Sequence, residues 1–295
     1  MIGELAALGA AISWTASAML YGKALQQTKP ISANIIRLSC TSAVLLLFLA
    51  VAAYASPSGL SVGTIALAAL SGIVGLALGD TLYMVSLKNI GVTRAVPITC
   101  TYPLFNLIWA AFLINEKPTL TLILGAIIIF LGVWLLSHEN NADHQRRSRL
   151  VSKGVVAAVV AAILWSVSIA TMDIAVKQTP SLNDAFTVNT VRTAAAALLL
   201  LTLSPLIDRE HNFIRLQKKT TITLTLGGLV ALGLGWFLLA YSFLGIPESQ
   251  AVPISSTTPL FSTLIGVTLV REKVTPQNIL GSIIVVAGIF LVFLA

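Results

Sequence analysis

Residues 95–117 read AVPITCTYPLFNLIWAAFLINEK, and residues 251–273 read AVPISSTTPLFSTLIGVTLVREK. The two stretches are identical at 11 of 23 positions, including two prolines, a Pro-Leu-Phe and a terminal Glu-Lys. A shared apolar composition does not by itself place prolines and charges in register, so the match indicates an internal duplication. The duplication extends in both directions, with the matched pairs Trp14 and Trp165, Ser17 and Ser168, Gly125 and Gly281, and Gly132 and Gly288.

The composition around this repeat is typical of a membrane protein. Of the 295 residues, 57% are hydrophobic and only 10% are charged, with a mean hydropathy of +0.93, whereas soluble domains are roughly one quarter charged. The net charge of +7 comes from cations in short segments between apolar runs. That distribution predicts contact with anionic lipid head groups and gives no basic face for nucleic acid.

Ten apolar stretches are long enough to cross a bilayer as helices, which requires about 20 residues each. They are 3–25, 33–54, 64–87, 93–114, 119–137, 153–177, 184–206, 222–244, 249–270 and 275–294. None shows the strict alternation of barrel strands. The predicted fold class is therefore an all-α polytopic membrane protein with ten transmembrane helices.

The repeat divides these helices into two sets of five. We predict a first five-helix unit over residues 1–137, a polar basic linker loop over 138–152 and a second five-helix unit over 153–295. An odd number of helices per unit leaves the two copies oppositely oriented in the membrane, as inverted repeats. This architecture is typical of alternating-access transport, in which a cavity between the copies opens first to one side and then to the other.

The cations predict the orientation of the chain. Fifteen of the 18 Lys and Arg residues fall on one side of the ten predicted helices, and the other side holds only Lys117, Lys177 and Arg192. The positive-inside rule places the cation-rich loops in the cytoplasm. Both termini are then expected outside the cell membrane.

The repeated Ala-Val-Pro-Ile, Pro-Leu-Phe and Glu-Lys pattern, followed by spaced glycines, resembles the EamA family of the drug/metabolite transporter superfamily. The resemblance covers essentially the whole chain. It implies ten helices in two inverted five-helix repeats, and its characterised members export amino acids or other small metabolites. The small four-helix drug exporters of the superfamily use a glutamate inside their first helix. Here Glu4 lies at the very start of that helix, which disfavours their drug/proton exchange.

Charged residues within the predicted helices are candidates for function, because they are costly in a bilayer and usually face protein or water. Arg37 and Asp80 are placed where they can meet. Arg37 is expected to bind a substrate carboxylate while Asp80 holds the arginine or receives a substrate ammonium group. Alternatively, the pair only fixes how the helices pack, or the arginine reaches out to the membrane interface. Asp173 and Arg192 are predicted as the analogous pair in the second copy, with a gating or structural role, and a direct substrate contact is the alternative. Asp80 is also the candidate carrier of a coupling proton.

The fourth and ninth helices carry prolines beside hydroxyl groups. Proline frees a carbonyl group on the preceding turn, which a membrane tolerates where a cavity or a hydroxyl satisfies it. Pro97 and Pro103, and Pro253 and Pro259, are therefore predicted helix kinks. The predicted substrate cavity is lined by Trp14, Ser17, Arg37, Asp80, Thr101, Tyr102, Asn106, Trp165, Thr257 and Thr258. Alternatively, the hydroxyls satisfy only the kinked helices, and further aromatic residues such as Tyr21, Tyr83 and Trp236 are packing residues.

Other classes of function find less support. The three histidines lie in loops, Cys40 and Cys100 lie in apolar runs, and no phosphate-binding loop is visible, so we predict no metal, no cofactor and no enzyme activity. The predicted function is a secondary transporter that moves a small polar metabolite, an amino acid or a related compound, outward by alternating access. A sugar or phosphorylated-solute importer or exchanger, or a membrane scaffold, are the alternatives. The sequence assigns no oligomeric partner.

Overall fold

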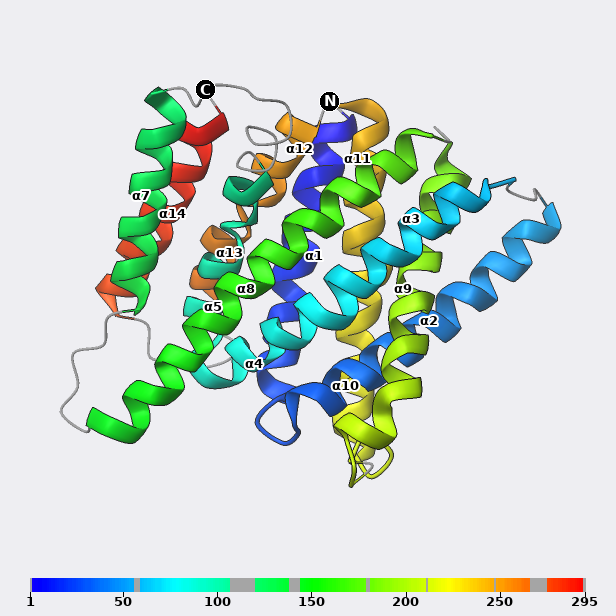
Figure 1. The fold of residues 1–295 in the computed structure, drawn as a ribbon, viewed down its shortest axis with the longest axis horizontal. Coiled ribbons are helices and arrows are strands. Elements are labelled where there is room, and N and C mark those ends of the chain that lie inside the picture. Colours follow the sequence, from blue (N-terminus) through cyan, green and yellow to red (C-terminus); the bar gives the residue numbers. More distant parts are fainter. Residues whose placement is uncertain are drawn as a thin grey trace.

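The long apolar stretches fold as helices that pack into one bundle (Figure 1). The computed structural model describes residues 2–55, 59–106, 120–137, 144–178, 181–210, 212–246, 248–265 and 275–293, and no strand occurs in these ranges. Six helical stretches are long and apolar enough to span a membrane: Ile2–Ala24, Pro30–Val51, Val62–Ile90, Arg149–Lys177, Leu182–Ile207 and Lys218–Gly245. Two shorter apolar helices cover Ile123–Leu136 and Pro276–Leu291. The chain is therefore a polytopic membrane protein.

The first half begins with two long helices, α1 (Ile2–Ala24) and α2 (Pro30–Ala55). The third predicted helix is continuous in direction but has three parts, α3 (Val62–Gly72), the π-helical η1 (Ile73–Gly79) and α4 (Asp80–Ile90). Next come α5 (Val92–Thr99) and α7 (Leu120–Ser137).

The second half repeats this order. It contains α8 (His144–Lys177), α9 (Leu182–Ile207), α10 (Lys218–Gly228), the π-helical η2 (Leu229–Gly235) and α11 (Trp236–Gly245). It ends with α12 (Glu248–Ser255), α13 (Thr258–Ile265) and α14 (Pro276–Phe293). The two π-helical segments are 156 residues apart, the same offset that aligns the duplicated proline segments.

The predicted linker loop differs from the structure. Residues 144–152 belong to α8, which starts at His144 rather than at the expected residue 153. This stretch contains no proline or glycine before Gly154, and its glutamine, arginines and lysine are good helix formers. The helix therefore continues beyond its apolar part. The rest of the predicted linker, residues 138–143, lies outside the described residues.

The fourth and ninth predicted helices are interrupted where the prolines predict a kink. Helix α5 ends at Thr99 and the helix resumes after Cys100 and Thr101, while α12 and α13 are separated by Ser256 and Thr257. Proline has no amide hydrogen, so Pro103 and Pro259 cannot bond to the preceding turn. The parts of these predicted helices beyond residues 106 and 265 lie outside the described residues.

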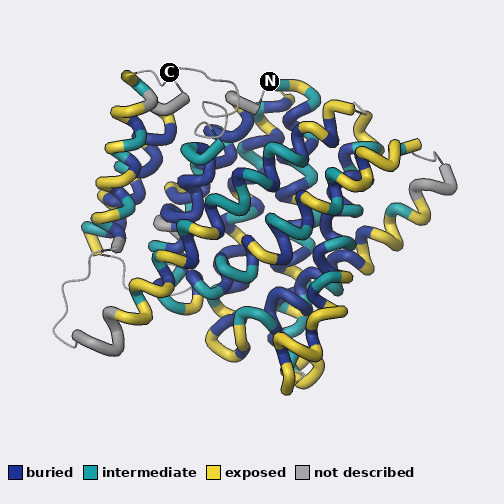
Figure 2. Tube along the Cα trace, in the orientation of Figure 1, coloured by how far each residue is buried: buried dark blue, intermediate teal, exposed yellow. Residues whose placement is uncertain are grey.

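The bundle has an apolar outer surface, and its mostly apolar interior also holds buried polar and charged residues. Its buried residues concentrate in the middle, and exposed residues follow the outer helices and the connections (Figure 2). Large apolar side chains such as Phe48 on α2 and Phe130 on α7 are 64% and 69% exposed, whereas Arg37 and Arg192 are almost completely buried. Exposed large apolar side chains together with buried charges fit a surface in contact with lipid.

Helices from the two halves interlock. Helix α1 packs against α10, η2 and α11, and α8 packs against α3, η1 and α4. Close approach depends on glycine at two points. A Cβ atom on Gly72 of α3 would overlap the backbone of Arg192 on α9, and one on Gly228 of α10 would meet the side chain of Thr41 and the carbonyl of Arg37 on α2.

Candidate functional site

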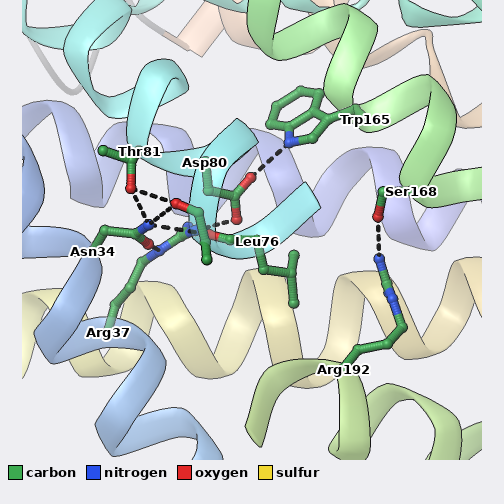
Figure 3. A network of polar contacts seen from close by, with 9 residues as sticks. Asn34, Arg37, Leu76, Asp80, Thr81, Trp165, Ser168 and Arg192 are labelled. Atoms are coloured by element: carbon green, nitrogen blue, oxygen red, sulfur yellow. Dashed lines mark hydrogen bonds and ion pairs between the residues drawn. The ribbon is translucent and has the colours of Figure 1, made fainter. Parts of the chain in front are cut away.

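The predicted meeting of Arg37 and Asp80 is confirmed. The Arg37 Nη2 atom donates to Asp80 Oδ2 in a buried ion pair between α2 and the first residue of α4 (Figure 3). Asp80 Oδ1 accepts a second hydrogen bond of 2.7 Å from Trp165 Nε1 on α8. The Asp80 carboxylate thus connects three helices, two from the first half and one from the second.

Asn34 holds this arginine in place and also supports η1. Its Oδ1 atom accepts from Arg37 Nε at 2.8 Å, and its Nδ2 atom donates to the carbonyl of Leu76 at 3.0 Å and to Thr81 Oγ1 at 2.8 Å (Figure 3). A π-helical turn disturbs the regular hydrogen bonding of the helix, and such turns recur at functional sites. The amide group therefore positions Arg37 and satisfies a carbonyl of the distorted segment at the same time.

Arg192 occupies the repeat position of Arg37 but has different partners. Its Nε atom donates to Ser71 Oγ at 2.8 Å and its Nη2 atom to Ser168 Oγ at 3.1 Å. Its Cζ atom lies 4.5 Å from the ring centroid of Trp236. The Nη1 atom is buried and has no hydrogen-bond partner among the described residues.

The predicted ion pair between Asp173 and Arg192 is wrong. Asp173 Oδ2 instead accepts from Lys177 Nζ at 2.7 Å, one turn further along α8. Lys177 is exposed near the end of that helix, so this pair lies towards the edge of the bundle. Lys177, four residues away on the same helix face, reaches the carboxylate directly. Arg192 donates to Ser71 and Ser168 instead of to the predicted Asp173.

A cavity lies between the two halves beside these charges. About 40 Å³ is open to the centres of water molecules, which is room for a few waters or one small polar head group. Among the predicted residues, Trp14, Ser17, Arg37, Asp80, Tyr102, Trp165 and Thr258 line it. The predicted residues Thr101, Asn106 and Thr257 are not among its described lining.

The two kinked segments meet next to this cavity. Tyr102 Oη lies 3.0 Å from Ser255 Oγ and accepts from Ser256 Oγ at 3.1 Å. The hydroxyls of Thr101 and Thr257 bond instead to carbonyls three residues earlier, at 2.7 and 2.8 Å. Thr101 and Thr257 therefore satisfy the kinked backbone, as the alternative expected, whereas Tyr102, Ser255 and Ser256 join the two halves, which neither prediction included.

Sequence reasoning left several lining residues out of the predicted cavity, namely Tyr21, Tyr83, Val96, Thr99, Cys100, Ala231, Leu232 and Trp236. A helical-spacing signal was available for two of them. Trp14, Ser17 and Tyr21 follow the i, i+3, i+7 spacing of one helix face, and Tyr83 lies three residues after Asp80. Aromatic rings consequently form a large part of the wall, with Trp14 and Trp236 centroids 5.0 Å apart and Tyr83 and Trp165 centroids 5.1 Å apart.

Comparisons with known proteins agree on a transporter family. The sequence model of the EamA-like transporter family matches residues 1–138 and 152–294. An uncharacterized transporter of Archaeoglobus fulgidus is 25% identical over 296 residues, covering 100% of this chain and 99% of that protein. The uncharacterized transporter YwfM of Bacillus subtilis is 34% identical over 65 residues, 22% of each chain.

A solved structure shares the fold. The crystal structure of a protein with 18% sequence identity superposes with a TM-score of 0.64, covering 98% of this chain and 95% of that chain. At this level of identity, the similarity concerns the fold alone.

Proposed function

Because the chain belongs to the EamA-like transporter family, we propose that it is a secondary transporter that exports a small polar metabolite, an amino acid or a related compound, across the cell membrane. One observation carries the proposal. The cavity is lined from both halves of the chain, by Trp14, Asp80 and Tyr102 from the first and by Trp165, Trp236 and Thr258 from the second. A site between two mobile halves is what alternating access requires.

We further propose that the halves, residues 1–137 and 153–295, are inverted five-helix repeats. Their interlocking supports this arrangement, because each half packs its first long helix on the third helix of the other half. In Figure 1, α1 starts at the upper edge and runs downward, whereas α8 starts at the lower left and runs upward. Opposite directions of repeat-related helices are expected for an inverted pair.

The edges of the bundle carry matched contacts that suit such a cycle. Thr220 Oγ1 donates to Gln27 Oε1 at 2.9 Å, and Thr64 Oγ1 donates to Gln178 Oε1 at 2.8 Å. Both residues of the first contact have their repeat counterparts in the second. In the proposed mechanism, one contact opens while the other stays closed, so the cavity is open to one side at a time.

Within the cavity, we assign substrate contacts to Trp14, Ser17, Arg37, Asp80, Tyr102, Trp165 and Thr258, which line it. Thr101, Asn106 and Thr257 remain candidates for contact once the halves move. Pro97, Pro103, Pro253 and Pro259 shape the kinked segments, and the described lining offers recognition by hydrogen bonds and rings without a catalytic group. If protons drive export, Asp80 is their carrier, because it is the one carboxylate among the described lining residues.

Counterflow in proteoliposomes tests the proposal. Vesicles holding the full chain are loaded with a mixture of amino acids, sugars and nucleosides, and the uptake of each labelled solute is followed with and without a pH gradient. Saturable, trans-accelerated uptake of amino acids or their relatives is the expected result. Uptake of sugars alone would reassign the substrate, and no uptake from inserted, folded protein would contradict transport of these classes. A D80N variant that responds to the pH gradient like the wild type would exclude the proton role of Asp80.

A further inference from the structure

The buried charges beside the cavity are uneven in a way that the proposed function does not explain. Arg37 and Asp80 line the cavity, whereas Arg192 is not among its described lining residues. Arg37, Arg192 and Asp80 are all at most 2% exposed, so two guanidinium groups share one carboxylate. Asp80 already accepts from Arg37 and from Trp165. A buried charge without a counter-charge is strongly unfavourable in a membrane interior, so Arg192 is expected to receive an anion from elsewhere.

The two copies differ at the position that would supply this anion. The offset of 156 residues places Trp236 at the repeat position of Asp80. In the first copy, the carboxylate at this position accepts from an arginine and from the indole nitrogen of Trp165. In the second copy, the indole ring of Trp236 faces Arg192. The face of an aromatic ring attracts a cation, but it does not replace the hydrogen bonds and the negative charge of a carboxylate.

The donors that would bind the missing carboxylate are nevertheless present. Trp14 is the repeat counterpart of Trp165, and both indoles lie against the glycine that ends a π-helical segment. An ideal Cβ on Gly79 would lie 3.1 Å from Trp165 Nε1, and one on Gly235 would lie 2.7 Å from Trp14 Nε1. Trp14 lines the cavity, and neither its Nε1 atom nor Arg192 Nη1 has a hydrogen-bond partner among the described residues.

We propose that Arg192 and Trp14 bind the carboxylate of the transported solute, which takes the place in the second copy that the Asp80 side chain takes in the first. The inference rests on the proposed function, because it takes the bound solute to be the transported substrate. It assigns the substrate class as carboxylate-bearing solutes and moves carboxylate recognition from Arg37, which Asp80 already occupies, to Arg192. Trp236 lines the cavity of about 40 Å³ and its ring lies against Arg192, so the proposal requires Trp236 to move aside when the solute carboxylate reaches Arg192.

Two substitutions at residue 236 separate the effect of an added negative charge from the effect of removing the indole ring. W236D supplies an internal carboxylate at the proposed anion position, whereas W236N removes the same ring without adding charge. The measurement is the thermal stability of the purified full chain in detergent during titration with each probe, because a ligand that binds the folded state raises Tm with its concentration. The probes are acetate, benzoate and a mixture of amino acids, compared with acetamide, benzamide, amino acid amides and chloride.

The expected results follow from the missing carboxylate. The carboxylates raise Tm saturably in the wild type and the amides do not. W236D binds carboxylates at least ten-fold more weakly than W236N. W14F, which loses the N–H donor to a charged acceptor together with part of the ring, binds carboxylates about ten-fold more weakly than the wild type. W134F on α7, a half-exposed tryptophan that does not line the cavity, behaves like the wild type.

Several outcomes would overturn the inference. These are equal binding of amides and carboxylates, equal binding by W236D and W236N, a chloride response that matches the carboxylates, or no response to any probe. If the residue 236 variants do not fold, unchanged binding by W14F is sufficient to reject the inference.

Counterflow tests transport separately from carboxylate binding. Carboxylate binding without counterflow would refute only transport, and counterflow of neutral solutes that R192Q leaves unaltered would refute only the carboxylate site.

Discussion

At the residue scale, the interior of this protein contains two buried arginines whose partners differ. Arg37 has the amide of Asn34 and the carboxylate of Asp80, and Arg192 has the hydroxyls of Ser71 and Ser168. Two arginines at one repeat position therefore acquired different environments. The difference originates at the partner position, where the first copy has an acid and the second has a tryptophan.

The Arg37–Asp80 pair predicts a strong energetic coupling. Removing either charge leaves the other buried and uncompensated, which costs about 3–5 kcal/mol, whereas removing both leaves two neutral amides. We expect R37Q and D80N each to lower the free energy of unfolding in detergent. The loss in the double variant is expected to be smaller than the sum of the two single losses, by a coupling energy of about 0.5–3 kcal/mol. Additive losses in this double-mutant cycle would contradict a direct pair.

At the element scale, two features hold the halves together: close helix contacts at glycine residues, and a connection fixed by hydrogen bonds to one side chain. Helices α3 and α9 approach at Gly72, and α2 and α10 approach at Gly228. The connection between α9 and α10 is held by Asp208, which accepts from Asn212 Nδ2 at 2.9 Å, from the Phe213 amide at 3.0 Å and from Ser32 Oγ at 3.1 Å. The last of these bonds ties the connection to α2.

A methyl group at Gly72 is predicted to separate α3 from α9. The added Cβ would overlap the backbone of Arg192, and overpacking of this kind costs typically about 1–3 kcal/mol. G72A is expected to lower Tm and to weaken transport. G63A on the same helix is the control, since the nearest atom to its Cβ is 3.6 Å away and alanine favours a helix over glycine. A G72A protein as stable as G63A would show that the close approach is not required.

The connection at Asp208 predicts a pH-dependent contribution to stability. Burial raises the pKa of this carboxyl, but the hydrogen bonds from Asn212, Phe213 and Ser32 outweigh it, so its pKa lies below the usual value. A lowered pKa adds stability above the unfolded pKa, about 3.9, and that stability is lost as the pH falls through the folded value. D208N should therefore be less stable than the wild type at pH 7, with a Tm difference that narrows below about pH 4. A constant difference across this range would contradict the assignment.

At the scale of the whole molecule, connections rich in cations gather at one edge. The turn between α1 and α2, the start of α8 and the connection between α9 and α10 lie at the lower edge of Figure 1, and α1 begins and α14 ends at the upper edge. Lys29 and Glu210 form an exposed ion pair of 2.8 Å between two of these connections. The positive-inside rule predicts that this edge faces the cytoplasm.

Cysteine labelling in intact cells tests that orientation. Arg215 lies between α9 and α10 and Lys177 at the end of α8, and both residues are exposed. In a C40S/C100S background, R215C is expected to be protected from a membrane-impermeant thiol reagent and K177C to be labelled. After permeabilisation, R215C should label as well. The reverse pattern would place the cation-rich edge outside the cell.

The sequence by itself determined the features that depend on composition and local order. Apolar length predicted the six long helical stretches that the described residues form, although the ten predicted spans stay a prediction. The duplicated proline segments predicted the two interruptions, and the depth of the charges predicted that Arg37 and Asp80 can meet. Tertiary structure alone decided which partner each group received. Asp173 pairs with Lys177, and Arg192 contacts two serines and Trp236. The indole of Trp165, from the second half, donates to Asp80 in the first. Those choices depend on the angles and depths at which helices distant in sequence cross, and one chain's residue pattern does not specify them.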